Sequence, residues 1–137
     1  MTTRRETLGG ALALFLQAIA ANAQSQSAPA ANPPIFVHDL PDVNLDGWEV
    51  TVSHVDYPPG RVGRAHKHAG FVLAYVLQGA IVTKISGQEQ RTYKPGEMFF
   101  EPPGSTHEVS SNASQTEPAR LLAMIFAKKG STLTTPV

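Results

Sequence analysis

Short runs of strand-forming residues, separated by turn residues, make up most of this chain. Residues 48–57 follow the two-residue period of a β-strand, with Val50 and Val52 on one face and Thr51 and Ser53 on the other. Further strands are expected at residues 71–77, 80–85, 90–93, 98–101, 107–111 and 120–126. Turns rich in Pro and Gly separate these runs, and a helical period is absent beyond the N-terminal region. Many short strands at this spacing predict an all-β sandwich or barrel.

The N-terminal residues carry the pattern of an export signal. Arg4 and Arg5 precede a short apolar stretch, and small residues up to Ala23 offer a cleavage site. The pattern resembles a twin-arginine signal, which exports proteins already folded, although Thr7 stands where that family usually has Phe. We therefore expect a signal peptide at residues 1–23 and a mature protein in the periplasm or outside the cell.

A buried helix or an uncleaved membrane anchor would be the alternative for this apolar stretch. A membrane-spanning helix needs about 20 apolar residues, and residues 8–20 form a shorter stretch that Gln17 interrupts. We therefore expect no membrane association after cleavage.

Residues 24–34 consist of Gln, Ser, Ala, Asn and Pro and predict a disordered linker. Residues 35–137 are expected to form one β-barrel domain.

The composition of the chain limits its partners and the residue types that can bind a metal. Lys plus Arg and Asp plus Glu balance at 11 each, so the chain has no net field to attract nucleic acid. Cysteine is absent from the sequence. Disulfides, thiolate metal ligands and cysteine nucleophiles are therefore excluded, and His, Asp and Glu remain as metal ligands.

Two histidine-containing segments carry the candidate chemistry. His66 and His68 are separated by one residue, so in an extended strand both imidazoles point to the same face and can bind one ion. A second segment places a Pro-Pro-Gly turn after residues 98–101 and then a returning strand that begins near His107. A third imidazole is thereby delivered from a distant part of the sequence.

These segments resemble the two sequence motifs of the cupin superfamily, in order and in spacing. The matching positions are Gly60, His66, His68 and Gly79 in the first motif, and Gly96, Pro102, Gly104 and His107 in the second. The asparagine of the second motif arrives one residue late, at Asn112, and Val72 stands where the first motif has a glutamate ligand. The resemblance covers residues 57–126 and implies a single β-barrel of the jelly-roll type.

Without that glutamate, the resemblance implies a metal site made by His66, His68 and His107. The alternative is that His66 and His68 are solvated residues of a basic segment, and that His107 is a core histidine whose ring nitrogens are hydrogen-bonded. Glu101 could supply a replacement carboxylate, but a glutamate before proline at a strand end is more often solvated or an acceptor beside the ligands. Two histidines outside both motifs are not expected to be ligands: His38 and His54.

The expected cofactor is one divalent metal ion. Fe or Mn is favoured because a protein exported in its folded state would receive its metal in the cytoplasm; Zn, Ni and Cu also bind imidazole. The resemblance to three-histidine cupins implies an oxygenase-type enzyme that acts on a small anionic or chelating organic substrate. The apolar lining of its pocket is expected to come from residues such as Val72, Leu73, Val82 and Phe100.

A non-catalytic protein that stores or senses a metal or small ligand is the main alternative, since one fold serves many functions. A metal-free sugar epimerase or isomerase is disfavoured, because such a site needs an acid–base pair in place of an intact histidine triplet. The resemblance also implies a homodimer, because cupins commonly pair through strand edges.

Overall fold

The computed structural model describes residues 32–137. The predicted signal peptide, and the part of the predicted linker before residue 32, lie outside these residues. Residues Pro33–Val137 form one compact unit. Nine strands and no helix occur within the described residues, so the all-β prediction is confirmed. In the same part of the chain, no helix is long and apolar enough to cross a membrane.

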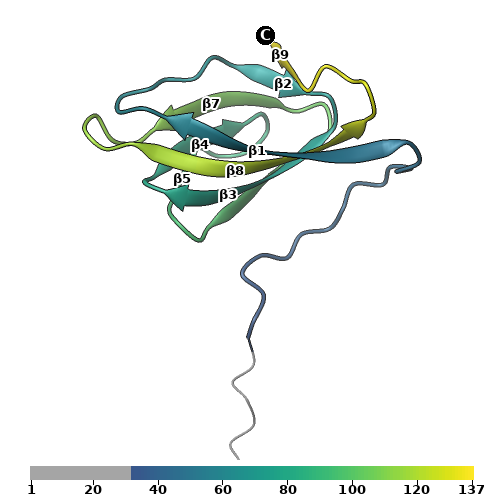
Figure 1. The fold of residues 1–137 in the computed structure, drawn as a ribbon, viewed down its shortest axis with the longest axis horizontal. Helices are drawn as coiled ribbons and strands as arrows, with labels where there is room; N and C mark the ends of the chain where they lie inside the picture. The colour runs from purple at the N-terminus through teal and green to yellow at the C-terminus, as the bar shows by residue number, and fades with distance from the viewer. Residues whose placement is uncertain (1–31) are drawn as a thin grey trace, which may run out of the picture. The chain divides into compact units, whose positions relative to one another are not determined.

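The first sheet has four antiparallel strands in the order β1-β8-β3-β6. Its members are β1 (Trp48–Tyr57), β8 (Ala119–Lys128), β3 (Phe71–Gln78) and β6 (Met98–Glu101). Strands β1 and β8 pair along their full length, and β3 lies on the other side of β8 (Figure 1). This sheet thereby joins segments that are far apart in the sequence.

The second sheet has five antiparallel strands in the order β5-β4-β7-β2-β9. Its members are β5 (Arg91–Tyr93), β4 (Ile81–Ile85), β7 (Thr106–Asn112), β2 (His66–His68) and β9 (Thr134–Pro136). It lies behind the first sheet in Figure 1, with the C-terminal strand β9 beside β2. The space between the two sheets is the interior of the barrel.

The strands agree with the sequence prediction, with ends that move by one or two residues. Strand β9 was not predicted, because its Thr-Thr-Pro sequence has neither apolar alternation nor a turn signal to mark it. All three of its residues are exposed, and the strand is held by its pairing with β2. A short edge strand of this kind is set by tertiary contacts, which a local pattern does not contain.

The apolar core fills one part of the barrel interior. It is a cluster of buried side chains from both sheets, comprising Tyr57, Ala74, Val76, Ile81, Phe99, Ala119, Leu121 and Ala123. Ile81 and Val76 are completely buried, and burying one such side chain contributes about 1.5–3 kcal/mol. The barrel is therefore stabilised by hydrophobic packing between strands of both sheets.

A β-bulge in β7 alters which of its side chains face inward. Lys84 pairs with Val109, but the next residue of β4, Ile85, pairs with His107, so Glu108 is an extra residue in β7. Side chains on a regular strand alternate between faces. The bulge breaks this alternation, and both His107 and Ser110 line the interior although they are three residues apart.

The same bulge accounts for the late asparagine of the second motif. Asn112 is buried, and its Nδ2 donates hydrogen bonds to the carbonyls of Tyr57 (3.0 Å), Pro58 (3.1 Å) and Glu117 (2.8 Å). Its Oδ1 accepts a hydrogen bond from the Ser114 amide at 2.8 Å. One additional residue in β7 thus moves the asparagine along the sequence, and this side chain ties β7 to two neighbouring loops.

Candidate metal centre

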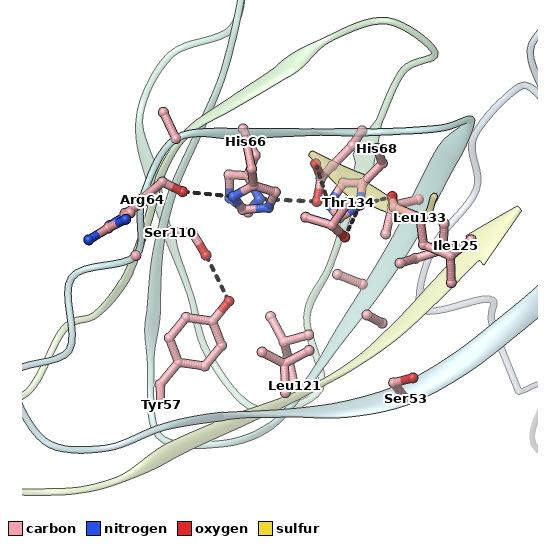
Figure 2. Close-up of a pocket in the computed structure, with 18 of the residues that line it drawn as sticks. Ser53, Tyr57, Arg64, His66, His68, Ser110, Leu121, Ile125, Leu133 and Thr134 are labelled. Atoms are coloured by element: carbon pink, nitrogen blue, oxygen red, sulfur yellow. Dashed lines mark hydrogen bonds and ion pairs between the residues drawn. The ribbon is translucent and has the colours of Figure 1, made fainter. Parts of the chain in front are cut away.

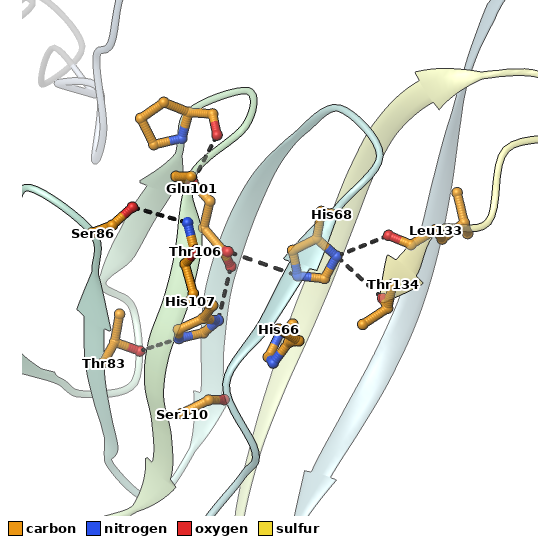
Figure 3. A network of polar contacts seen from close by, with 12 residues as sticks. His66, His68, Thr83, Ser86, Glu101, Thr106, His107, Ser110, Leu133 and Thr134 are labelled. Carbon is orange, nitrogen blue, oxygen red and sulfur yellow. Dashed lines mark hydrogen bonds and ion pairs between the residues drawn. The ribbon is translucent and has the colours of Figure 1, made fainter. Parts of the chain in front are cut away.

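The three predicted ligands come together at one end of the barrel interior. His66 and His68 lie on β2, and His66 is directly opposite His107 of β7 in the antiparallel pairing. One ring nitrogen from each histidine can be chosen so that all three lie within 4.8 Å of one another. Figure 3 shows the three imidazoles grouped between β7 and β2. The sequence prediction of this grouping agrees with the structure.

Each imidazole has one nitrogen in contact with an oxygen outside the cluster. His66 Nδ1 donates to the Arg64 carbonyl at 2.8 Å, and His68 Nδ1 donates to the Leu133 carbonyl at 3.1 Å. A carbonyl only accepts hydrogen bonds, so Nδ1 carries the proton in both rings and Nε2 carries a free lone pair. Such contacts fix the ring orientation and tautomer of metal-binding histidines.

His107 is turned the other way. Its Nε2 lies 3.4 Å from the Thr83 hydroxyl, and its Nδ1 lies 3.2 Å from Glu101 Oε1. The ring is 3% exposed, and Thr83 is equally buried. The nitrogen that faces the cluster is therefore Nδ1, whereas His66 and His68 can present Nε2 (Figure 3).

Glu101 is a buried member of this group. It is 4% exposed, which contradicts the expectation of a solvated side chain, whereas the other expectation, an acceptor beside the ligands, agrees with its position. Its Oε2 lies 3.7 Å from His68 Nε2, while Oε1 faces His107. The local sequence suggested exposure because a proline follows, but the pairing of β6 with β3 turns this side chain inward.

Burial also shifts the pKa values of His68 and Tyr57. Desolvation lowers the pKa of His68, and the Glu101 carboxylate partly opposes this shift. The imidazole of His68 is therefore neutral at neutral pH, which is the form that binds a metal. Burial raises the pKa of Tyr57, so this phenol stays protonated and remains able to donate a hydrogen bond.

The donor set fits a divalent metal ion. Three imidazoles converge from two strands, and two of them have Nδ1–H groups held by backbone carbonyls and Nε2 atoms that remain free. The other two histidines of the chain lie elsewhere, as predicted. His54 is exposed on β1, and His38 stacks on Phe100 at a ring-centroid distance of 4.2 Å.

The histidines face a cavity of about 570 Å³ between the two sheets (Figure 2). Its walls are largely apolar and include Val55, Val72, Ala74, Phe99, Leu121, Ala123 and Ile125. Of the lining residues expected from the sequence, only Val72 is present. Leu73 lies on the opposite face of β3, and Val82 and Phe100 are also absent from the lining.

Several polar residues of the cavity were not anticipated. Tyr57 was expected to serve only in packing, but it also lines the cavity and shares a 2.7 Å hydrogen bond with Ser110 (Figure 2). Two exposed arginines, Arg61 and Arg64, line it as well. The arginines lie between the first glycine and first histidine of motif 1, which is a sequence signal for proximity to the site.

Comparison with known proteins identifies the family. Residues 53–125 match the cupin domain family, and the chain belongs to it. A comparison with curated protein sequences finds no match.

Solved structures of similar fold include several enzymes. The DMSP lyase DddQ of Ruegeria pomeroyi is 20% identical with a TM-score of 0.56, over 64% of this chain and 43% of the lyase. An oxalate oxidase solved with the substrate analogue glycolate is 21% identical with a TM-score of 0.55, over 79% and 66% of the two chains.

A predicted oxalate decarboxylase from Thermotoga maritima is 25% identical with a TM-score of 0.51, over 61% of this chain and 69% of that protein. The protein thus spans less than half of the DMSP lyase and about two thirds of each oxalate-related protein. The likeness to the lyase and the oxidase, at 20% and 21% identity, shows the shared fold.

Proposed function

We propose that this protein is a mononuclear metal-dependent enzyme of oxygenase type that acts on a small anionic or chelating organic substrate. The observation that carries the proposal is the placement of three convergent imidazoles on the wall of an otherwise largely apolar 570 Å³ cavity. A concave apolar site with a few convergent polar groups is the usual setting for small-molecule chemistry. His66, His68 and His107 would hold the metal.

Charge at the cavity supports an anionic substrate. A divalent ion held by three imidazoles would keep a net positive charge beside the single Glu101 carboxylate, and Arg61 and Arg64 add positive charge at the lining. The apolar walls contributed by β1, β3 and β8 exclude water and strengthen this attraction. A bound ion would supply a Lewis acid and a template for a chelating substrate.

Tyr57 and Ser110 add a hydrogen-bonding pair to the cavity. Their hydroxyls contact each other at 2.7 Å, and both residues are almost completely buried. Because burial keeps the Tyr57 phenol protonated, this pair can donate a hydrogen bond to an anionic oxygen of the substrate. Tyr57 from the first sheet and Ser110 from the second would thus orient the substrate in the cavity.

The structural relatives support the substrate class. The oxalate oxidase and the predicted oxalate decarboxylase are named for a small dianion, and glycolate is another small carboxylate. We therefore include small carboxylates in the candidate panel for this chain. Fe or Mn remains the proposed metal, with Zn, Ni and Cu as the alternatives.

The test is elemental analysis of the purified protein, followed by oxygen-uptake assays with small carboxylates, diketones, phenols and thiols. We expect about one metal ion per chain and oxygen uptake with at least one of these classes. His66→Ala should abolish both, and His54→Ala serves as the matched control that should retain both. A stable metal content without turnover of any class would favour the storage or sensor function instead.

We also propose that the protein is exported to the periplasm or beyond. The support is the arginine pair, apolar stretch and small residues before Gln24. Intact-mass analysis of the extracytoplasmic protein should give a chain that begins at Gln24. Recovery of the full-length chain in the membrane fraction would contradict this.

A further inference from the structure

Val72 and Glu101 are direct neighbours across two strands. They are paired residues in the antiparallel β3–β6 register, and opposite residues of such a pair project from the same face of the sheet. Both line the cavity, and both are at most 4% exposed. The carboxylate of Glu101 can therefore reach the space in front of Val72 from the adjacent strand.

The carboxylate faces one nitrogen that has no proton to offer it and a second nitrogen whose proton depends on the tautomer of His107. His68 uses its Nδ1–H for the Leu133 carbonyl, so the Nε2 atom 3.7 Å from Glu101 Oε2 carries a lone pair. When His107 donates its Nε2–H to the Thr83 hydroxyl, its Nδ1 atom, 3.2 Å from Oε1, also carries a lone pair. In that tautomer the two nitrogens and the carboxylate oxygens are all electron-pair donors, and a cation between them would remove their repulsion.

These separations suit ligands that share one ion. Metal–nitrogen and metal–oxygen bonds to histidine and carboxylate are about 2.0–2.2 Å long. Two ligand atoms on one ion are then about 3.0 Å apart at a right angle and at most about 4.2 Å apart when opposite. The distance from Glu101 Oε1 to His107 Nδ1 is 3.2 Å and that from Oε2 to His68 Nε2 is 3.7 Å, and both lie in this range. The group whose donor atoms all lie within 4.8 Å of one another consists of the three histidines, so the Glu101 side chain would turn toward the ion on binding.

The burial of the Glu101 carboxylate also favours a cation beside it. A carboxylate is costly to bury unless a charge or hydrogen-bond donors compensate it. Within residues 32–137, the ion-pair contacts of the Glu101 carboxylate are with His68 and His107. A divalent ion would compensate this charge and satisfy both histidines at once.

We propose that Glu101 is the fourth protein ligand of the metal and supplies from β6 the carboxylate that position 72 of β3 lacks. This inference rests on the proposed metal site. Val72 is small enough to leave room for the Glu101 side chain, whereas glutamates at both positions would place two buried anions side by side. The carboxylate reduces the net charge of the site and adds an oxygen donor, which suits Mn and Fe better than imidazoles alone do.

Metal affinity of a variant series tests the proposal. The metal-free wild type, Glu101→Gln, Glu101→Ala and the double variant Val72→Glu/Glu101→Gln are titrated with Mn²⁺ and Zn²⁺ by calorimetry. Glu101→Gln should lower the affinity by more than about 100-fold, a larger loss than a group beside the ligands causes. The double variant should recover a substantial part of the loss, because it returns a carboxylate from the neighbouring strand.

Glu108→Gln is the matched control, because it removes a carboxylate one residue from His107 that pairs with Lys84 outside the cluster. Its affinity should stay within about threefold of wild type. Far-ultraviolet circular dichroism confirms that each variant is folded. A crystal structure of the wild type soaked with Mn²⁺ tests the same point without a substitution, and a Glu101 oxygen within about 2.2 Å of the ion is expected.

The outcomes separate the two proposals. If His66→Ala, His68→Ala and His107→Ala keep full metal affinity, the metal site itself is wrong. If these variants lose the metal while Glu101→Gln binds like wild type, only the fourth-ligand proposal is overturned. Loss in Glu101→Ala but not in Glu101→Gln would also overturn it, because glutamine can still accept a hydrogen bond from His107 and orient its ring.

Discussion

The interior of the barrel has two regions of opposite character, built from the same strands. In one region, Val76 and Ile81 pack in an apolar cluster and are completely buried. In the other, three imidazoles and the carboxylate of Glu101 occupy buried or half-buried positions. The apolar end gains free energy by excluding water, whereas the polar end is costly to desolvate and gains most when a cation is bound.

This contrast shows how the fold separates stability from chemistry. Strand β3 contributes Val76 to the apolar cluster and Val72 to the cavity that contains the histidines. Strand β7 contributes His107 at one end and Asn112, which ties loops together, at the other. A substitution at one end should therefore change one property and leave the other nearly intact.

The largest expected effect is loss of metal from the polar end. Alanine at His66, His68 or His107 removes a ligand and should weaken binding by well over about 100-fold, the upper effect of losing a group beside the ligands. Metal titration of the purified variants measures this. His54→Ala on β1 should bind like wild type, and an equal loss there would mean that the ligand set is wrong.

The largest expected effect on folding comes from the apolar end. Ile81→Ala removes a completely buried side chain and should lower the free energy of unfolding by about 2–5 kcal/mol. Urea denaturation monitored by Trp48 fluorescence measures the change. Metal affinity, measured below the unfolding transition, should change by less than about threefold; a large loss would show that the two ends are coupled.

Removal of the metal should have a moderate effect. The apolar cluster is complete without it, so the chelated protein should remain folded, unlike a zinc finger. Free metal at about 100 times its Kd adds about 2.7 kcal/mol to the free energy of unfolding. Thermal unfolding with and without a chelator tests this, and a chelated protein already unfolded at 25 °C would contradict the separation of roles.

The smallest expected effect concerns pH in the metal-free protein. The folded-state pKa of His68 lies below the unfolded value of about 6.5. Between these two values the unfolded state binds more protons, so the free energy of unfolding should fall as pH drops through about 6.5 and level off below the folded pKa. Urea denaturation from pH 7.5 to 5 measures this slope, which should become smaller in His68→Gln. An unchanged slope would assign the effect to another group.

Most of the fold could be predicted from the sequence because nearby residues alone identify most of the strands. The alternation in β1 and the turns around Gly79, Gly87 and Gly96 define strands without reference to the rest of the chain. The grouping of the three histidines was also predictable, because the spacing of His66 and His68 places both on one face of β2 and the second motif adds His107.

The remaining features depend on long-range pairing. The run from Phe71 onward is continuously apolar and has no alternation, so its pattern alone does not exclude Leu73 from the cavity, although the motif position of Val72 indicates that Val72 faces it. The burial of Glu101 follows from its register with Val72, and the inward turn of Ser110 follows from the bulge at Glu108. The register leaves no sign in the nearby residues, whereas the bulge leaves one, the position of Asn112 one residue late in the second motif.

Strand β9 gives the metal centre a mechanical coupling to the C-terminal residues. Both the Leu133 carbonyl, 3.1 Å away, and the Thr134 hydroxyl, 3.2 Å away, contact the Nδ1 atom of His68. Binding and pairing are then thermodynamically linked, so a metal that favours the oriented imidazole must also favour the paired state of β9 by the same factor. Metal occupancy should accordingly slow amide hydrogen exchange in β9, and a force that pulls this strand away should release the ion.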